Sequence, residues 1–403
     1  MHKIERLLQT LAPKGVEFRK LGEVINIFKG KQLNKELLLD YGEYPVMNGG
    51  IHASGYWNEY NTDYPKIIIS QGGASAGYVN YMTSKFWAGA HCYAIELNSE
   101  KLNYKFLYYF LKNSQTILMK SQFGAGIPAL NKADIETLTI PIPPLEIQQE
   151  IVKILDAFTE LNTELNTELK ARKKQYEYYR NMLLDFNDIN QSHKDAKEKL
   201  ARKPYPKRLK TLLQTLAPKG VEFRKLGEVC EILDNRRIPI AKNKRNPGIY
   251  PYYGANGIQD YIDSYIFDGD FVLVGEDGSV INKDNTPVVN WASGKIWVNN
   301  HAHVLQTKNE LKLKFLYFYL QTIDVSYYVA GTPPKINQEN LKKITIPIPP
   351  LEIQQEIVKI LDQFSALTTD LLAGIPAEIK ARKKQYEYYR EKLLAFKPLT
   401  PLK

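Results

Sequence analysis

The chain has 403 residues, of which 44% are hydrophobic, 24% charged and 11% aromatic; it is globular in composition and too long for one ordinary core. Lysine and arginine (54) outnumber aspartate and glutamate (44), and the net charge of +10 permits a polyanionic partner without establishing one. Cys92 and Cys230 lie far apart, which excludes a disulfide framework or a cysteine-based zinc site. Without a long apolar stretch or a signal-peptide core, we expect a cytoplasmic protein with no membrane segment.

An internal repeat dominates the sequence. Three blocks recur without change: residues 7–24 at 212–229, residues 139–156 at 345–362, and residues 170–180 at 380–390. The chain is therefore two copies of one unit. Between these blocks the copies share only a skeleton, such as Trp87 and His91 against Trp297 and His301. Identical segments predict identical partners and different surfaces predict different ligands, although drift after a recent duplication is the alternative.

The block that follows Pro143-Pro144 predicts a long helix, because proline is tolerated in a first helical turn. Apolar side chains then recur at steps of four and three, the pattern of a coiled-coil seam, at Ile147, Ile151, Ile154, Phe158, Leu161 and Leu165. A further step of four leads to Leu169, and the seam resumes at Tyr176 and Tyr179. The tetrapeptide Thr159–Asn162 is repeated at Thr163–Asn166, and the extra step of four locally unwinds a supercoil.

The second copy repeats this seam at Ile353, Ile357, Ile360, Phe364, Tyr386 and Tyr389. Gly374-Ile375-Pro376 interrupts it and predicts a break or kink. We expect the two helices to run antiparallel and to bury their stripes against each other. Between the copies, the polar and basic residues 188–211 are interpreted as a solvated linker, with phosphate contact as the alternative.

Two motifs resemble catalytic or metal sites. Gly73–Gly77 matches the G-x-S-x-G nucleophile elbow, but the following residues predict a strand and not the required helix. His301-Ala302-His303 is interpreted as core or hydrogen-bonding histidine, since the first copy lacks the pair. The sequence has no Walker A loop, no G-x-G-x-x-G and no Cys-x-x-Cys. We expect no catalytic residue and no metal site.

The order of variable region and long helix, repeated twice, resembles the specificity (S) subunit of Type I restriction–modification systems. The resemblance covers essentially the whole chain and is carried by TIPIPPLEIQQEIVKILD, KARKKQYEYYR and the tandem tetrapeptides. It implies an α+β fold in which two globular α/β target-recognition domains are separated by two long antiparallel coiled-coil helices, with pseudo-two-fold symmetry.

The implied organisation has five segments: a first target-recognition domain at 1–140 (variable core 25–138), a spacer helix at 141–187, the linker at 188–211, a second domain at 212–346 (variable core 230–344), and a second spacer helix at 347–403. Each domain would read half of a bipartite, asymmetric site in double-stranded DNA. The helices would set the spacing and dock two methyltransferase (M) subunits. These carry S-adenosylmethionine and methylate adenine N6; two restriction (R) subunits add ATP- and magnesium-dependent cleavage. This chain itself would bind no cofactor.

Candidate DNA-binding residues follow from the chemistry of phosphate and base contacts, which favours lysine, arginine, asparagine and glutamine in exposed turns. In the first domain they are Lys29, Lys31, Gln32, Asn48, Gly49, Gln71, Gly72 and Gly73. In the second they are Asn235, Arg236, Arg237, Lys242, Lys244, Arg245, Asn256, Glu276 and Asp277. The seam residues named above are the candidates for spacing and partner docking.

Three alternatives stay open. A stand-alone DNA-binding protein would leave long apolar helix faces uncovered. A hydrolase would have to use Ser75. A purely structural coiled coil would give the divergent domains nothing to discriminate.

Overall fold

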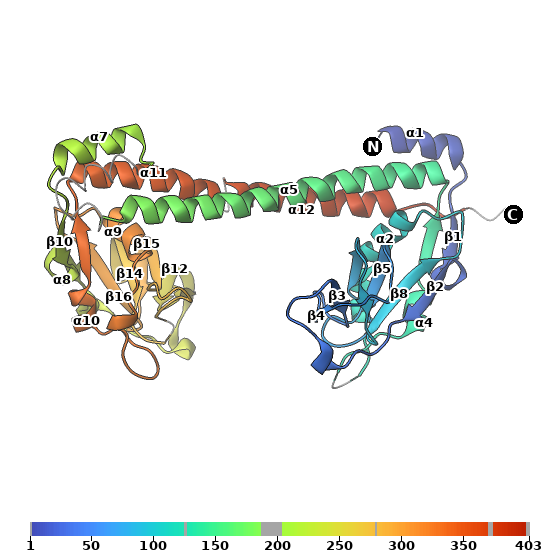
Figure 1. Ribbon diagram of the computed structural model, residues 1–403, viewed down its shortest axis with the longest axis horizontal. Helices are drawn as coiled ribbons and strands as arrows, with labels where there is room; N and C mark the ends of the chain where they lie inside the picture. The colour runs from blue at the N-terminus through green and yellow to red at the C-terminus, as the bar shows by residue number, and fades with distance from the viewer. Residues whose placement is uncertain (1, 125–126, 187–203, 279, 370–373, 400–403) are drawn as a thin grey trace. The chain divides into compact units, whose positions relative to one another are not determined.

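The computed structural model describes residues 2–124, 127–186, 204–278, 280–369 and 374–399. The chain divides into two compact units, unit 1 with residues 1–166 and 378–403, and unit 2 with residues 167–377 (Figure 1). The boundary falls inside helix α5 (Leu145–Leu184), directly after the second tetrapeptide. Each unit therefore holds part of α5.

Unit 1 combines three small sheets with helices. Its elements are α1 (His2–Leu11), β1 (Glu17–Lys20), η1 (Leu21–Glu23), β2 (Ile25–Lys29), η2 (Lys35–Leu37), β3 (Tyr44–Met47), β4 (Gly55–Trp57), β5 (Lys66–Ser70), β6 (Val79–Met82), β7 (Trp87–Ala88), β8 (Cys92–Leu97), α2 (Tyr104–Asn113), α3 (Gln115–Lys120), α4 (Lys132–Glu136), β9 (Thr139–Ile142), the first part of α5, and α12 (Ile375–Leu394) from Glu378. The strand orders are β2-β8-β5-β6, β4-β3-β7 and β1-β9.

Strand β5 shows how the sheet separates two cores. Side chains alternate across a strand, so Ile67 and Ile69 enter the larger cluster with α2 and α5, while Ile68 joins Phe86 and Met47 on the other face. All three isoleucines are buried. The run Ile67-Ile68-Ile69 is thus a strand covered on both faces.

Unit 2 repeats this plan with one larger sheet, order β11-β16-β14-β15-β12-β13, and the pair β10-β17. Its elements are the last part of α5, α7 (Lys207–Leu216), β10 (Glu222–Lys225), α8 (Leu226–Val229), β11 (Cys230–Ile232), η4 (Asp234–Arg236), η5 (Lys242–Lys244), β12 (Pro247–Gly254), β13 (Gly257–Ile262), β14 (Phe267–Gly275), β15 (Val289–Val298), β16 (Ala302–Thr307), α9 (Leu313–Leu320), η6 (Ser326–Tyr328), α10 (Gln338–Lys343), β17 (Thr345–Ile348), α11 (Leu351–Thr369) and the start of α12.

Each long helix is fixed to its domain by one buried glutamine. Gln148 donates to the carbonyl oxygens of Lys101 (2.8 Å) and Pro143 (2.6 Å) and accepts from the amide of Asn103 (2.7 Å). Gln354 makes the corresponding three bonds at the start of α11. Both side chains are fully buried, so the glutamines fix the direction in which α5 and α11 leave their domains.

The helices exchange partners between the two copies. In unit 1, Phe158 of α5 stacks on Tyr389 of α12, with ring centroids 5.5 Å apart. In unit 2, Phe364 of α11 stacks on Tyr179 of α5 at 5.3 Å. The phenylalanines occupy equivalent positions of the repeat, as do the tyrosines, so each copy presents the same pair of groups to the other. Within each unit the helices run antiparallel (Figure 1), which confirms the predicted antiparallel arrangement and internal repeat.

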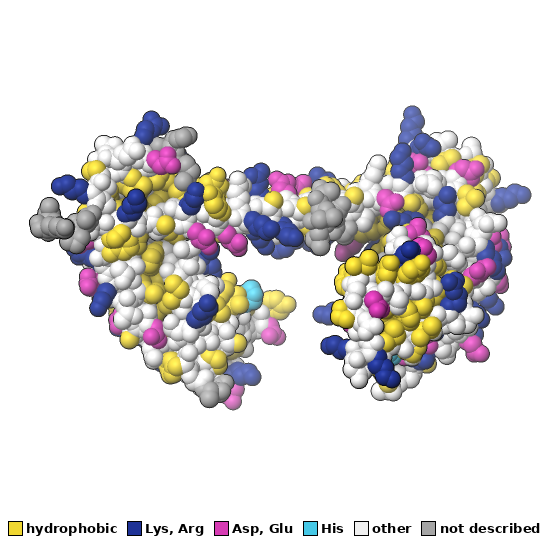
Figure 2. Space-filling view, turned by 180° about the vertical axis from the view of Figure 1, so that it is seen from behind, with side chains coloured by type: hydrophobic (Ala, Val, Ile, Leu, Met, Phe, Trp, Pro, Cys, Tyr) yellow, Lys and Arg dark blue, Asp and Glu magenta, His cyan; other side chains and the backbone are white. Residues whose placement is uncertain are grey.

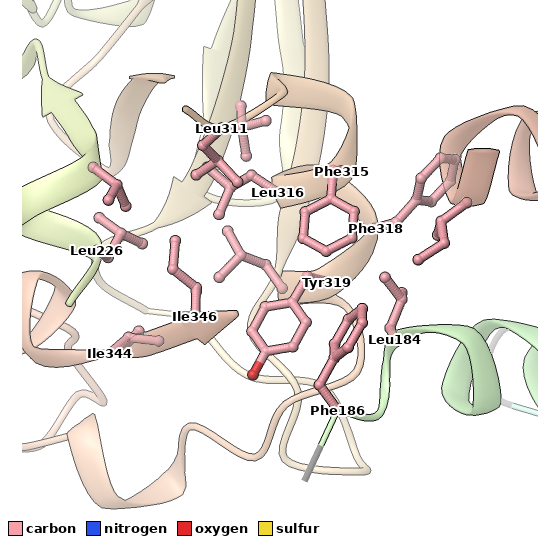
Figure 3. Close-up of a cluster of buried hydrophobic side chains, with 14 of the residues drawn as sticks. Leu184, Phe186, Leu226, Leu311, Phe315, Leu316, Phe318, Tyr319, Ile344 and Ile346 are labelled. Carbon is pink, nitrogen blue, oxygen red and sulfur yellow. The ribbon is translucent and has the colours of Figure 1, made fainter. Parts of the chain in front are cut away.

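The same exchange closes each core. Leu393, Leu394 and Phe396, near the end of the chain, pack into the core of unit 1. In unit 2, Leu184 and Phe186 from the end of α5 lie against Phe315 and Tyr319 of α9 (Figure 3). Neither unit has a complete core made from its own copy of the repeat.

This packing bears on the docking role predicted for the seam. Ile147, Ile151, Ile353 and Ile357 are fully buried in the two cores. The remaining seam residues are half-buried: Ile154, Phe158, Leu161, Leu165, Tyr176, Tyr179, Ile360, Phe364, Tyr386 and Tyr389. The four buried isoleucines are therefore not available to a partner protein, whereas docking by the half-buried seam residues stays a prediction.

Two predicted segments fall partly outside the described residues. The predicted interruption is found, since α11 ends at Thr369 and α12 begins at Ile375; residues 370–373 are not described. Pro376 lies in the first turn of α12, where proline is tolerated. Residues 188–203 of the predicted linker are also outside the description, whereas 207–211 belong to α7 because Leu209 and Leu213 are buried.

Candidate nucleic-acid interface

Backbone hydrogen bonds bring the predicted turns of unit 1 together beside His91. The amide of Gln71 donates to the carbonyl oxygen of His91, and the amide of Leu130 donates to that of Gln71, both at 2.8 Å. The amide of His91 in turn donates to Asn48 Oδ1 at 3.2 Å. The Asn48–Gly49 and Gln71–Gly73 turns therefore meet at one edge of the unit, together with residues 128–130.

Unit 2 builds the same frame from different side chains. The amide of Glu276 donates to the carbonyl oxygen of His301 (2.9 Å), and the amide of Ile336 donates to that of Glu276 (2.8 Å). A tryptophan indole fixes the neighbouring loop in each unit, Trp87 on the carbonyl oxygen of Lys31 (3.0 Å) and Trp297 on that of Ile238 (2.6 Å). One backbone frame thus presents Gln71 in one unit and Glu276 in the other.

The candidate turns of unit 1 differ in exposure. Lys29, Lys31 and Gln32 are exposed, as phosphate contacts require. In contrast, Asn48, Gly49, Gln71, Gly72 and Gly73 are half-buried, so these turns are less exposed than expected. Gly49 (φ +112°) and Gly73 (φ +79°) adopt left-handed backbone conformations that favour glycine. Their role in the frame is therefore to shape the turns.

In unit 2, two candidate arginines are held against aromatic rings. Arg236 lies 4.8 Å from the ring centroid of Phe267, and Arg245 lies 4.1 Å from that of Tyr252. Arg236 is exposed, whereas Arg245 is half-buried and lies 3.5 Å from Asp260. The further exposed candidates are Asn235, Lys242, Lys244 and Asn256. Lys242 and Lys244 are exposed, as a side chain that contacts phosphate has to be.

Arg237 and Glu276 are not positioned as free base-reading groups. Their side chains are only 10% and 13% exposed and form an ion pair of 2.6 Å. The neighbouring Asp277, 28% exposed, is paired with His301. The sequence does not distinguish a charged side chain that is exposed from one that is paired inside a domain. Arg237, Glu276 and Asp277 are paired.

The described residues contain one cluster with metal-ligand chemistry, formed by Asp234, Glu276 and His303, whose ligand atoms lie within 4.8 Å of one another. Arg237 and Lys335 already bind Glu276, Lys335 at 3.1 Å. Two cations therefore compensate the carboxylates, and the cluster is an internal ion-pair network. His303 is buried and hydrogen-bonded, as the sequence predicts. The sequence does not single out Asp234 or Lys335 as members of this network.

The predicted decoys behave as ordinary structure. Ser75 lies in a tight turn after β5, and the chain continues into β6 at Val79 where a nucleophile elbow would open a helix. Burial raises the pKa of the Cys92 thiol to about 12, and that of Cys230 to about 12, far above the range of a reactive thiolate. No described helix is long and apolar enough to span a membrane.

On the face of the molecule seen in Figure 2, the described basic side chains do not form one continuous patch. In the view of Figure 2, lysine and arginine side chains are interspersed with aspartate and glutamate on both units and along the helices.

The two units thus share one backbone frame but carry different polar side chains on it. This arrangement is that of a protein that recognises a site in two parts. The family described as "Type I restriction modification DNA specificity domain" matches residues 13–173 and 218–381, and the chain belongs to this family. Membership confirms the DNA-recognition role and the non-catalytic assignment, and it argues against a stand-alone DNA-binding protein.

Relatives agree with this assignment. A Haemophilus influenzae type I restriction enzyme specificity subunit is 45% identical over 179 residues, which make up 43% of this chain and 46% of that relative. The Escherichia coli EcoR124I/EcoR124II specificity subunit is 28% identical across 99% of this chain and 98% of its own. The crystal structure of the S subunit from M. genitalium has the same fold, with a TM-score of 0.63 at 20% identity over 94% of this chain and 96% of that one.

Proposed function

We propose that unit 1 and unit 2 each read one half of a bipartite, asymmetric site in double-stranded DNA. The observation that carries this proposal is the shared backbone frame with different exposed side chains in the loops beside it, Lys29, Lys31 and Gln32 in one unit against Asn235, Arg236 and Lys242 in the other. A common frame positions each domain alike on a duplex, and different side chains read different base edges.

The partners follow from what the copies share. Two methyltransferase (M) subunits bind the identical segments, supply S-adenosylmethionine and methylate adenine N6 in the cytoplasm. Two restriction (R) subunits add ATP- and magnesium-dependent cleavage. This chain contributes recognition and holds no cofactor. The modest basic charge fits an assembly in which the M subunits provide part of the phosphate contact.

Exposed apolar side chains recur at equivalent positions of the identical segments. The pairs have nearly equal exposed fractions: Leu11 and Leu216 (both 42%), Leu145 (39%) and Leu351 (41%), and Tyr178 (57%) and Tyr388 (53%). Apolar groups that are exposed alike in both copies fit two copies of one partner. They are docking candidates in addition to the half-buried residues of the seam.

A domain exchange tests the reading function. Replacing residues 25–138 by the corresponding segment of another family member, followed by genome-wide mapping of methylated adenines with the M subunits present, is expected to change one half-site only. If both halves changed, the assignment of one half-site to each unit would be wrong.

A double variant tests docking. Tyr178→Ser with Tyr388→Ser is expected to weaken co-purification with the M subunits by about tenfold or more, because two exposed aromatic contacts are lost. Tyr41→Ser is the matched control, since Tyr41 is 90% exposed but lies outside the identical segments. Equal co-purification of all three proteins would refute the docking surface.

A further inference from the structure

A buried charged cluster lies behind the candidate reading edge of unit 2. The His303 side chain is fully buried, with Nδ1 2.6 Å from Asp234 Oδ2 and Nε2 2.7 Å from the carbonyl oxygen of Ile336. A carbonyl oxygen only accepts, so Nε2 donates to Ile336. Asp234 also accepts from the amide of Val304 (3.1 Å). The imidazole therefore connects β16 to η4 and to the segment before α10.

Arg237 extends this cluster to Glu276, the residue that follows β14. Its Nη1 donates to Glu276 Oε2 (2.6 Å) and to the carbonyl oxygen of Ala302 (2.7 Å), and Nη2 lies 3.4 Å from Asp234. Lys335 binds the other oxygen of Glu276 at 3.1 Å. One set of ion pairs thus joins four segments near the candidate interface, at residues 234–237, 276, 303 and 335. We name its buried part the His303 cluster: Asp234, Arg237, Glu276 and His303.

Unit 1 has no such cluster at the matching positions. The strand pairs Ile27–Ile95 and Ile232–Leu305 correspond, so two residues further on Lys29 and Tyr93 match Asp234 and His303. Lys29 is exposed, and the Tyr93 hydroxyl donates to the carbonyl oxygen of Leu130 at 3.2 Å. A neutral bond in unit 1 thus replaces the charged contacts of unit 2, although Leu130 and Ile336 occupy the same place in the frame.

We propose that the His303 cluster is a positioning device that sets the specificity of unit 2 for its half-site without contacting DNA. The inference rests on the proposed reading function. Removing one member leaves its buried partners without compensation, and the frame can relieve this only by moving the loops they hold. The loop residues next to the cluster, Asp277, His301 and Lys335, would then be displaced at the reading edge.

Glu276→Gln and His303→Gln test this in the complete chain assembled with the M subunits. Glu276→Gln keeps the shape of the side chain and removes its charge. Methylation rates are measured on duplexes that carry single base changes in either half-site, after the domain exchange has assigned each half to a unit. We expect discrimination in the half read by unit 2 to fall about tenfold, the scale of one base-pair mismatch, while discrimination in the other half stays within twofold.

The control is Tyr93→Phe, which removes the matching bond in unit 1 and leaves discrimination by unit 2 unchanged. Circular dichroism and co-purification with the M subunits establish that each variant is folded. A folded Glu276→Gln or His303→Gln complex that discriminates both halves like the wild type would overturn the inference. Loss of folding in both variants would do so too, since the cluster would then serve stability alone. If the wild-type complex itself showed no bipartite preference, the proposed function would fail instead.

Discussion

Deleting the tetrapeptide Thr163–Asn166 is expected to shorten the unread gap between the two half-sites. Helix α5 belongs to both units, and the deletion lies at their boundary. Four residues contribute a rise of about 6 Å and a rotation of about 400°, some 40° more than a full turn. B-DNA rises about 3.4 Å and turns about 35° per base pair. The translation thus corresponds to about two base pairs and the rotation to about one.

The helix itself tolerates the change of length. Thr163 Oγ1 donates to the carbonyl oxygen of Thr159 (2.9 Å), and Asn166 Nδ2 donates to that of Asn162 (2.6 Å). Both bonds lie within the tetrapeptide array. The threonine and the asparagine of one tetrapeptide each donate to the carbonyl oxygen of the same residue type in the tetrapeptide before it. The deletion therefore removes a complete repeat and leaves the stacked pairs of Phe158 and Tyr179 present.

The assay is methylation of a duplex panel in which both half-sites are constant and the gap varies by single base pairs. The deletion is expected to shift the preferred gap down by one to two base pairs, and insertion of a further tetrapeptide to shift it up by the same amount. The control Thr163→Ala with Asn166→Ala keeps the length and is expected to keep the gap. An unchanged gap in a stably assembled deletion variant would refute the ruler role of α5, as would loss of one half-site.

Three further outcomes are expected. Gln148→Leu removes the partner of three backbone groups and is expected to destabilise the chain by about 1–3 kcal/mol in thermal denaturation, while the exposed Gln149→Leu has little effect; equal losses would contradict the anchoring role. Lys29→Ala with Lys31→Ala is expected to weaken DNA binding equally on all sequences and to lower the salt slope by about 1.8, measured by anisotropy at several salt concentrations; a loss confined to one sequence would indicate base contact instead. Burial, together with a nearby arginine, lowers the pKa of Lys112 to about 8, below its unfolded value, so its contribution to stability rises as the pH increases from about 8 to 10.5. Denaturant unfolding across this range is expected to show the rise in the wild type and a flatter profile in Lys112→Met; parallel profiles would refute it.

The sequence predicts those features that depend on a pattern. The identical blocks reveal two copies, the spacing of apolar residues reveals α5, and Pro376 marks the interruption before α12. Each rests on local chemistry or on direct comparison of the two halves. Comparison of the two halves could also have predicted that residues 128–130 and 334–336 belong to the frame. Asn131 and Asn337 mark the same position directly after these segments.

The remainder depends on contacts between distant segments. The seam predicts an apolar stripe but not what covers it, so the stacking of Phe158 on Tyr389 could not be distinguished from partner docking. Likewise, the sequence is compatible with exposed Arg237 and Glu276 side chains that contact DNA. Only the fold shows that they lie 2.6 Å apart and are largely buried. Sequence supplies the donors and acceptors, whereas tertiary structure decides which are still free.

The division of the two cores also sets the order in which a newly made chain can fold. Unit 2 is a continuous stretch, residues 167–377, and is complete once this stretch has left the ribosome. Unit 1 begins first but lacks Leu393, Leu394 and Phe396 until the last residues emerge. At about 5–20 residues per second, the intervening 211 residues (377 − 167 + 1) take roughly 10–40 s. During synthesis the N-terminal unit therefore waits for the C-terminal helix, and the domain made first is the last to be finished.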